Sequence, residues 1–247
     1  MSRKIYIDAG HGGVQPGACN GKRKESDDVL RLALMVQELL ADQDCEVRMS
    51  RTKDVDIEIP ERCRDANKWG ADYFLSIHRN SHYSSSSTGN EIWIYSKANE
   101  YTEAKAKIIL DNVCKANGLK NRGVKRGAPK YRDYAVNRDT KMHSALIELG
   151  FISNPNDNKV YDAKLEAIAL AIAKSVLSVV GGNYVVSGDV NGDGKVTAAD
   201  AREALRAAAK IEVLNDKEAA AADMNGDGDV TAYDAREILK KASGVKT

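Results

Sequence analysis

A repeat near the carboxyl end constrains the fold of this chain more than any other feature of its sequence. The segment DVNGDGKVTAADAREAL at 189–205 returns as DMNGDGDVTAYDAREIL at 223–239, an offset of 34 residues. A repeat of this length and similarity predicts two copies of one small structural unit. Because the chain has 247 residues, the repeat also leaves room for a separate, larger domain before it.

Each repeat begins with a twelve-residue loop of oxygen-bearing side chains, in which a glycine at position 6 allows a sharp turn. The expected ligands are Asp189, Asn191, Asp193, Lys195 (through its backbone carbonyl) and Asp200 in the first loop, and Asp223, Asn225, Asp227, Asp229 and Asp234 in the second. Hard oxygen ligands at this spacing suit Ca²⁺, so we expect two calcium ions, one in each loop. The alternative is a polar turn whose aspartates only cap the following helix.

The two loop–helix units resemble a dockerin, the calcium-binding module that docks onto cohesin domains. The resemblance covers about residues 187–244 and rests on the loop residues. It implies a small all-α domain, similar to an EF-hand in its loops, that folds on calcium and has a protein partner. Loop positions 10 and 11, which often set partner choice in dockerins, are Ala198-Ala199 and Ala232-Tyr233 here instead of the common Ser/Thr pair. Cohesin binding, self-association and a purely stabilising role therefore stay open.

The preceding segment alternates strand and helix patterns, which predicts an α/β domain with a mostly parallel twisted sheet flanked by helices. We expect strands at 4–8, 46–51, 73–78, 91–95 and 145–149, and helices at 27–41, 60–69, 99–117 and 158–180. The segment GGNYVVSG reads as a linker. The expected organisation is a catalytic domain at 1–181, a linker at 182–188 and a calcium-loop domain at 189–247.

Two histidines and two glutamates occupy positions that suit a metal site. His11 follows the first expected strand and His78 ends the third, and open α/β sheets bind ligands at the carboxyl ends of strands. Glu25 stands just before the first helix, after a glycine-containing loop. Two imidazoles and one carboxylate match a catalytic zinc site with an open fourth position, so we expect one Zn²⁺. Glu148, a carboxylate in an expected buried strand, is the candidate general base.

Spacing alone leaves purely structural roles for these four residues open, but several motifs occur in a familiar order. IDAGHGG is followed by KES, SRTKD, ERCRDANKWGADYFLSIHRNS and ALIELGFISNPND. Over about residues 3–180 the chain resembles the zinc-dependent N-acetylmuramoyl-L-alanine amidases of the amidase-3 family. The resemblance implies His11, Glu25 and His78 as zinc ligands and Glu148 as the catalytic glutamate. Asn80, two residues after His78, is a further candidate for contact with substrate.

The function implied by this resemblance is hydrolysis of peptidoglycan at the amide bond between muramic acid and L-alanine, as in a phage endolysin or a bacterial autolysin. Two alternatives stay open. One is a zinc peptidase that cuts within the stem peptide of the wall, and the other is a non-catalytic protein that binds cell walls.

Charge and hydropathy limit the partners further. The chain carries 37 basic and 36 acidic side chains, a balance that argues against a general nucleic-acid binder. Residues 1–182 hold 28 basic and 24 acidic side chains, and residues 183–247 hold 9 and 12. Six basic residues within 120–132 predict a solvated loop, with contact to an anionic cell wall as the alternative.

Localisation is expected at the bacterial cell wall. No run of 18 apolar residues predicts a membrane-spanning helix, and no apolar stretch of signal-peptide length follows the amino terminus. We therefore expect either release from a host cytoplasm by a phage, or secretion with the signal already removed.

Overall fold

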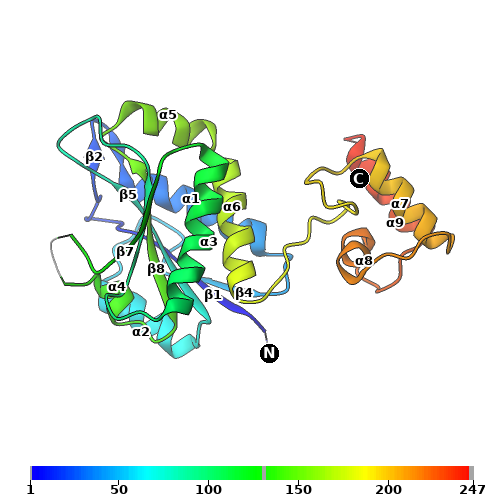
Figure 1. Ribbon diagram of the computed structural model, residues 1–247, viewed down its shortest axis with the longest axis horizontal. Coiled ribbons are helices and arrows are strands. Elements are labelled where there is room, and N and C mark those ends of the chain that lie inside the picture. Colours follow the sequence, from blue (N-terminus) through cyan, green and yellow to red (C-terminus); the bar gives the residue numbers. More distant parts are fainter. Residues whose placement is uncertain (1, 130–131, 245–247) are drawn as a thin grey trace. The chain divides into compact units, whose positions relative to one another are not determined.

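The computed structural model describes residues 2–129 and 132–244 and divides the chain into two compact units, Met1–Gly182 and Asn183–Thr247 (Figure 1). Each unit has its own cluster of buried apolar side chains. Among the described residues, every helix is too short or too polar to span a lipid bilayer.

A six-stranded sheet forms the centre of the first unit, in the order β4-β1-β5-β8-β6-β7. Its strands are β1 (Lys4–Ala9), β4 (Glu46–Met49), β5 (Tyr73–Asn80), β6 (Asn90–Ile94), β7 (Asn121–Arg126) and β8 (His143–Phe151). Neighbouring strands are parallel except for β6 and β8, which run antiparallel. A separate ribbon pairs β2 (Cys19–Asn20) with β3 (Arg23–Lys24). The expected mostly parallel α/β sheet is therefore confirmed.

Helices cover both faces of this sheet (Figure 1). On one face, α6 (Leu165–Val179) packs between α1 (Glu25–Leu40) and α3 (Glu100–Asn117). On the other face lie α2 (Ile59–Trp69) and the short α4 (Ala135–Arg138), where Tyr6, Phe74 and Leu146 of three strands join their core. Side chains alternate across a strand, so the neighbours of these three residues in the strands point to the opposite layer.

Helix α1 forms where the apolar spacing predicts it. Its apolar stripe is fully buried, and the stripe consists of Val29, Leu32, Val36 and Leu40. The helix begins at Glu25 rather than at residue 27, because the preceding loop satisfies its first amides. The N–H of Glu25 donates to the carbonyl of Ala18, and that of Ser26 donates to the carbonyl of Pro16. Glu25 is thus fixed at the first turn of a helix.

The prediction of a solvated loop at 120–132 is wrong for the first half of that segment. Residues 121–126 form strand β7, which pairs in parallel with β6 at the edge of the sheet. An edge strand tolerates basic side chains because one of its sides faces solvent. Of the six basic residues, Lys130 lies outside the described residues.

The prediction of a single helix at 158–180 is also wrong, because the structure divides this segment into two helices. Asn154 caps α5 (Pro155–Ala163), and Pro155 starts that helix three residues earlier than expected. Lys164 then leaves the helical conformation, with φ −117° and ψ 14°, before α6 begins. No glycine or proline marks this break in the sequence.

The second unit is all-α, as expected. It contains α7 (Ala198–Ala208), α8 (Asp216–Ala222) and α9 (Ala232–Ala242), and the core between them is formed by Val190, Ala201, Ala204, Ala222, Ala235 and Ile238. α7 and α9 follow the two loops and pack against each other. Thr197 and Asp200 form a capping box at the start of α7, and Thr231 and Asp234 do the same for α9.

Candidate active site

His11, Glu25 and His78 meet where β1 ends, α1 begins and β5 nears its end. One ligand atom from each lies within 4.8 Å of the others. The Glu25 carboxylate lies between the two imidazoles, with Oε2 3.2 Å from His11 Nε2 and Oε1 2.9 Å from His78 Nδ1. Across the described ranges 2–129 and 132–244, this is the one group of three or more His, Cys, Asp or Glu side chains that close together.

Glu25 is held as an anion in this cluster. Burial would raise its pKa, but the hydrogen bonds from His11 and His78 outweigh burial and hold the pKa well below its usual range. Two backbone amides add to this, because Ala18 N–H donates to Oε2 at 2.8 Å and Arg79 N–H donates to Oε1 at 3.0 Å. An ionised carboxylate between two imidazoles is a donor set that fits zinc.

Two buried arginines fix the backbone that carries His11. Arg62 donates to the His11 carbonyl at 2.8 Å and pairs with the buried Asp8 at 2.9 Å. Arg51 donates to the carbonyls of Ala9 and Gly10 at 2.9 Å and 2.8 Å. His11 itself adopts the left-handed conformation, with φ 59°, which is uncommon outside glycine. The hydrogen bonds from the two arginines to the carbonyls of this loop help to hold the conformation.

Glu148 faces the same space from the neighbouring strand. His78 and Glu148 are paired in the register of β5 and β8, and both line a cavity of about 390 Å³ that also holds His11 and Glu25. Burial, together with the charges of Glu25 and Glu91, raises the pKa of Glu148 well above its usual value. Its Oε2 atom is buried and has no hydrogen-bond partner among the described residues. A buried carboxyl without partners can exchange a proton with a substrate or water in the cavity.

Asn80 lines this cavity as well, but its side chain is already engaged. Its Nδ2 donates to Glu91 Oε1 at 2.9 Å, and its Oδ1 accepts from the Ser81 N–H at 2.8 Å. Sequence reasoning gave no role to Tyr134, which also lines the cavity. Nothing in the local sequence marks Tyr134, because it reaches the site through the turn before α4.

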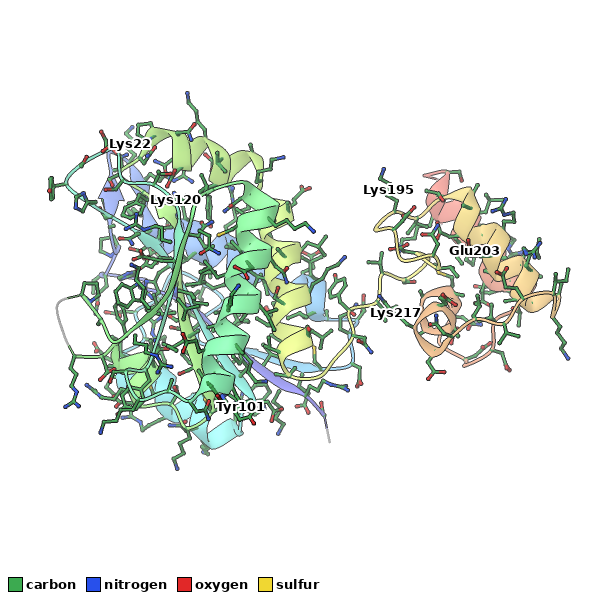
Figure 2. The ribbon with its side chains drawn as sticks, in the orientation of Figure 1. Lys22, Tyr101, Lys120, Lys195, Glu203 and Lys217 are labelled. Atoms are coloured by element: carbon green, nitrogen blue, oxygen red, sulfur yellow. The ribbon has the colours of Figure 1, made fainter. Side chains whose placement is uncertain are left out.

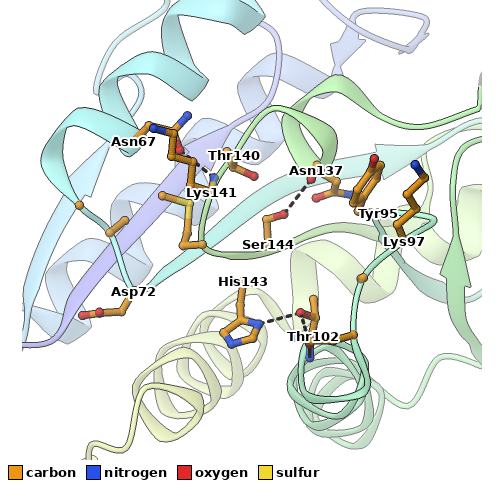
Figure 3. A pocket seen from close by; sticks show the side chains of 15 residues that line it. Asn67, Asp72, Tyr95, Lys97, Thr102, Asn137, Thr140, Lys141, His143 and Ser144 are labelled. Atoms are coloured by element: carbon orange, nitrogen blue, oxygen red, sulfur yellow. Dashed lines mark hydrogen bonds between the residues drawn. The ribbon is translucent and has the colours of Figure 1, made fainter.

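The other two histidines stay outside the cluster. His143 is the first residue of β8, whereas Glu148 lies in the second half of that strand. His143 lines a separate cavity of about 550 Å³ (Figure 3). Its Nδ1 hydrogen bonds with the Thr102 hydroxyl at 2.6 Å. His82 is exposed, and its ring lies tilted against that of Tyr83, with 4.0 Å between the ring centroids.

In the second unit, the first candidate calcium loop is ordered around Asp189. Asp189 Oδ2 accepts from the Gly194 N–H at 2.9 Å, while Oδ1 is buried and lacks a hydrogen-bond partner within the described part of the chain. Such an orphaned carboxylate oxygen fits a cation ligand. The exposed side chain of Lys195 projects away from the loop (Figure 2), so only its backbone is available to an ion.

Three further carboxylates of the loops, those of Asp200, Asp223 and Asp234, accept hydrogen bonds from backbone N–H groups of their own loops. Asp200 accepts from the N–H groups of Asn191 and Thr197, at 3.1 Å and 2.8 Å. In the second loop, Asp223 accepts from the Gly228 N–H at 2.8 Å, and Asp234 accepts from the Met224 N–H at 2.9 Å. The loop carboxylates are not drawn together as tightly as the histidine cluster is.

Comparisons with known proteins assign both units. Residues 5–178 match the N-acetylmuramoyl-L-alanine amidase family, which is zinc-dependent, and residues 187–242 match the dockerin type I domain, which binds calcium. A similar curated protein is the N-acetylmuramoyl-L-alanine amidase CwlM of Bacillus licheniformis, 36% identical over 156 residues, which are 62% of this chain and 58% of the relative. The endolysin of Bacillus phage SPP1 is 32% identical over 185 residues, 73% of this chain and 67% of the relative.

Solved structures agree with this assignment. The catalytic domain of CwlV, an N-acetylmuramoyl-L-alanine amidase from Bacillus (Paenibacillus) polymyxa var. colistinus, is 30% identical with a TM-score of 0.66, covering 71% of this chain and 97% of that one. An N-acetylmuramoyl-L-alanine amidase from Clostridium difficile 630 is 29% identical with a TM-score of 0.67, covering 72% and 96%. The chain spans 58% of the length of CwlM and 58% of that of the sporulation-specific N-acetylmuramoyl-L-alanine amidase of Bacillus subtilis (strain 168). The chain belongs to the N-acetylmuramoyl-L-alanine amidase family, amidase-3 type, and carries a dockerin type I domain at its carboxyl-terminal end.

Proposed function

We propose that the first unit is a zinc-dependent peptidoglycan hydrolase that cleaves the amide bond between N-acetylmuramic acid and L-alanine. The observation that carries this proposal is the convergence of His11, Glu25 and His78 with Glu148 around one cavity. The names of the relatives support it, since they include amidases and an endolysin.

In the proposed mechanism His11, Glu25 and His78 hold one zinc ion. Zinc at such a site would supply Lewis acidity, which polarises a carbonyl and lowers the pKa of water so that water can lose a proton and act as a nucleophile near neutral pH. Glu25 is ionised, and the backbone amides of Ala18 and Arg79 hold it in place; these two amides would still donate to its carboxylate when the imidazole nitrogens bind zinc. Arg62 and Arg51 keep the His11 backbone in the position that the cluster requires.

Glu148 carries the proton in this mechanism. It accepts a proton from the attacking water and passes that proton to the nitrogen of L-alanine as the bond from the lactyl carbonyl carbon to this nitrogen breaks. Burial favours the first of these transfers, from water to Glu148, because a desolvated carboxylate is a stronger base. A cation in the neighbouring cluster would offset part of the raised pKa, so that the ionised form is available when the reaction starts.

Product analysis separates this proposal from its alternatives. An amidase releases peptides that begin with the free amine of L-alanine. A zinc peptidase would expose an amine within the stem peptide, and a non-catalytic wall-binding protein would sediment with walls without releasing any amine.

For the second unit we propose two calcium ions and a protein partner. The ligands would be the side chains of Asp189, Asn191, Asp193, Asp200, Asp223, Asn225, Asp227 and Asp234, with the backbone carbonyls of Lys195 and Asp229. The orphaned Oδ1 of Asp189 supports a cation in the first loop. A cohesin is the partner class that the dockerin match supports, with self-association as the alternative. Calorimetric titration with calcium, then with cohesin domains, tests both steps.

The proposed organisation keeps a catalytic domain at 1–181, a linker at 182–188 and a dockerin domain at 189–247. The proposed site of action is the bacterial cell wall, as an endolysin or an autolysin. Both roles have support among the relatives, which include a phage endolysin and a probable cell wall amidase, LytH, of Staphylococcus aureus.

A further inference from the structure

A second cavity, of about 520 Å³, adjoins the candidate active site at the β6–β7 edge of the sheet. Asn80, Ser81 and Tyr134 line both this cavity and the one that holds the histidine cluster. Because the two cavities share three lining residues, a substrate that extends past the cluster can enter the second one.

The second cavity carries about one net positive charge. Glu91 is 4% exposed, and its Oε2 accepts from Arg122 Nε at 2.7 Å, with Lys125 Nζ at 3.8 Å from the same oxygen. These three residues are the Asp, Glu, Lys and Arg side chains among the described residues that line the cavity. One carboxylate therefore offsets one of two cations.

The Glu91 carboxylate is already engaged by three donors, whereas the two cations still have donors to spare. Its Oε1 already accepts from Asn80 Nδ2 and Trp93 Nε1, at 2.9 Å and 3.1 Å. Lys125 has three N–H donors, and its contact with Glu91 is longer than a hydrogen bond. Among the described residues, Arg122 Nη2 makes no hydrogen bond. Glu91 thus holds the two cations in place and leaves donors free.

The mobility of these donors is limited by ring contacts. Lys125 Nζ lies 5.7 Å from the centroid of the Trp93 ring, and the Arg122 guanidinium lies 5.0 Å from that of Phe151. The side chains remain 35% and 33% exposed, respectively, so a ligand can reach them. Cations held over aromatic faces form a partly preorganised anion site.

The positive charge of the second cavity indicates which part of the proposed substrate would bind there. Sugars of the glycan are neutral, and the carboxyl group of muramic acid is consumed in the amide bond. Carboxylates occur on the peptide side of that bond. We propose that Lys125, supported by Arg122, binds a carboxylate of the stem peptide, so that peptides with free carboxylates are preferred over amidated ones. This inference rests on the proposed amidase activity.

Two synthetic muramoyl peptides test it, identical except that the carboxylates beyond L-alanine are free in one and amidated in the other. The KM of the unchanged protein should be about tenfold lower for the free acid, the factor expected of one charge-assisted hydrogen bond. In Lys125→Gln this advantage should disappear. Lys120→Gln is the matched control, because it removes an exposed charge one residue before β7 and outside the cavity (Figure 2). It should keep the preference.

Equal KM values for the two peptides, or a preference that survives Lys125→Gln, would overturn the inference. If neither peptide is hydrolysed, the proposed function is contradicted instead. Binding then decides the inference separately, by calorimetry on the zinc-loaded Glu148→Gln protein. Tighter binding of the free acid that is lost on adding Lys125→Gln supports the carboxylate site, and equal affinity for both peptides overturns it.

Discussion

His78 and Glu148 lie opposite each other in the register of β5 and β8, so a candidate zinc ligand and the candidate base come from adjacent parallel strands. This pairing makes the distance between these two side chains a property of the sheet rather than of a loop. A base fixed in this way needs little rearrangement to act, which is a requirement for efficient proton transfer.

We expect Glu148→Gln to lower kcat on purified peptidoglycan by about a hundredfold to ten-thousandfold, the usual contribution of a general base. Zinc content should be unchanged and the unfolding temperature should not fall, because the Glu148 Oε2 atom makes no hydrogen bond within the described residues and a neutral amide costs less to bury than a carboxylate. Glu100→Gln, at an exposed position of α3, is the control. Undiminished turnover in Glu148→Gln would remove this residue as the base.

Zinc should bind at one ion per chain through the histidine cluster. His78→Ala should lose most of this zinc, because one of three ligands is removed. His82→Ala should keep it, since His82 follows His78 by four residues but lies outside the cluster. Metal analysis after dialysis measures both variants. Full zinc content in His78→Ala would refute this ligand set.

The buried pair of Asp8 and Arg62 should make the stability of the first unit depend on pH. Burial would raise the pKa of Asp8, but Arg62 and the Ser76 hydroxyl outweigh burial and hold that pKa below its usual range. A lowered native pKa contributes stability above the unfolded value of roughly 3.9, and this stability is lost as pH falls through the native pKa. The free energy of unfolding, measured with urea in the presence of a chelator, should therefore decrease below about pH 4.

Arg62→Met should destabilise the first unit by about 3–5 kcal/mol at neutral pH, because the Asp8 carboxylate stays buried without its partner. The native pKa of Asp8 then rises, so the sign of the pH dependence reverses and this variant gains stability relative to the unchanged protein on acidification. Arg64→Met, on the exposed side of α2, should behave like the unchanged protein. If Arg62→Met lowers the free energy of unfolding by the same amount at every pH, Asp8 is not the group whose titration causes the pH dependence.

Calcium should stabilise the second unit and bind at two sites. Scanning calorimetry should show an unfolding transition that moves to higher temperature as calcium is added. An ion that binds only the folded state stabilises that state more as the ion concentration rises. Asp189→Ala and Asp223→Ala should each reduce the stoichiometry from two to one. Binding of two ions by both variants would contradict the assignment of the first loop position.

Much of the fold could be predicted because the apolar patterns are strong and local. The stripe on α1 and the continuous apolar runs of β5 and β8 are visible in the sequence, and the same residues form the core. The cluster of His11, Glu25 and His78 could be predicted because the two histidines stand near the carboxyl ends of neighbouring parallel strands and Glu25 stands at the start of a helix, and the topology of such a sheet brings these positions together.

The remaining features depend on tertiary contacts. β7 was missed because Asn121–Arg126 has little apolar alternation and is held by its backbone pairing with β6. The antiparallel direction of β6 against β8 is set by the connections between strands and leaves no local pattern. The ion pair of the buried Glu91 with the partly exposed Arg122 joins two segments 31 residues apart, and residue type alone does not pair them.

The central claim is that this chain cuts the bond between muramic acid and L-alanine with zinc. The most direct measurement is mass spectrometry of the products from purified peptidoglycan, with zinc-loaded protein and with chelated protein. We predict stem peptides that begin with L-alanine, released by the zinc-loaded protein and absent after chelation. New amino termini within the stem peptide, or no released peptide in the presence of zinc, would contradict the claim.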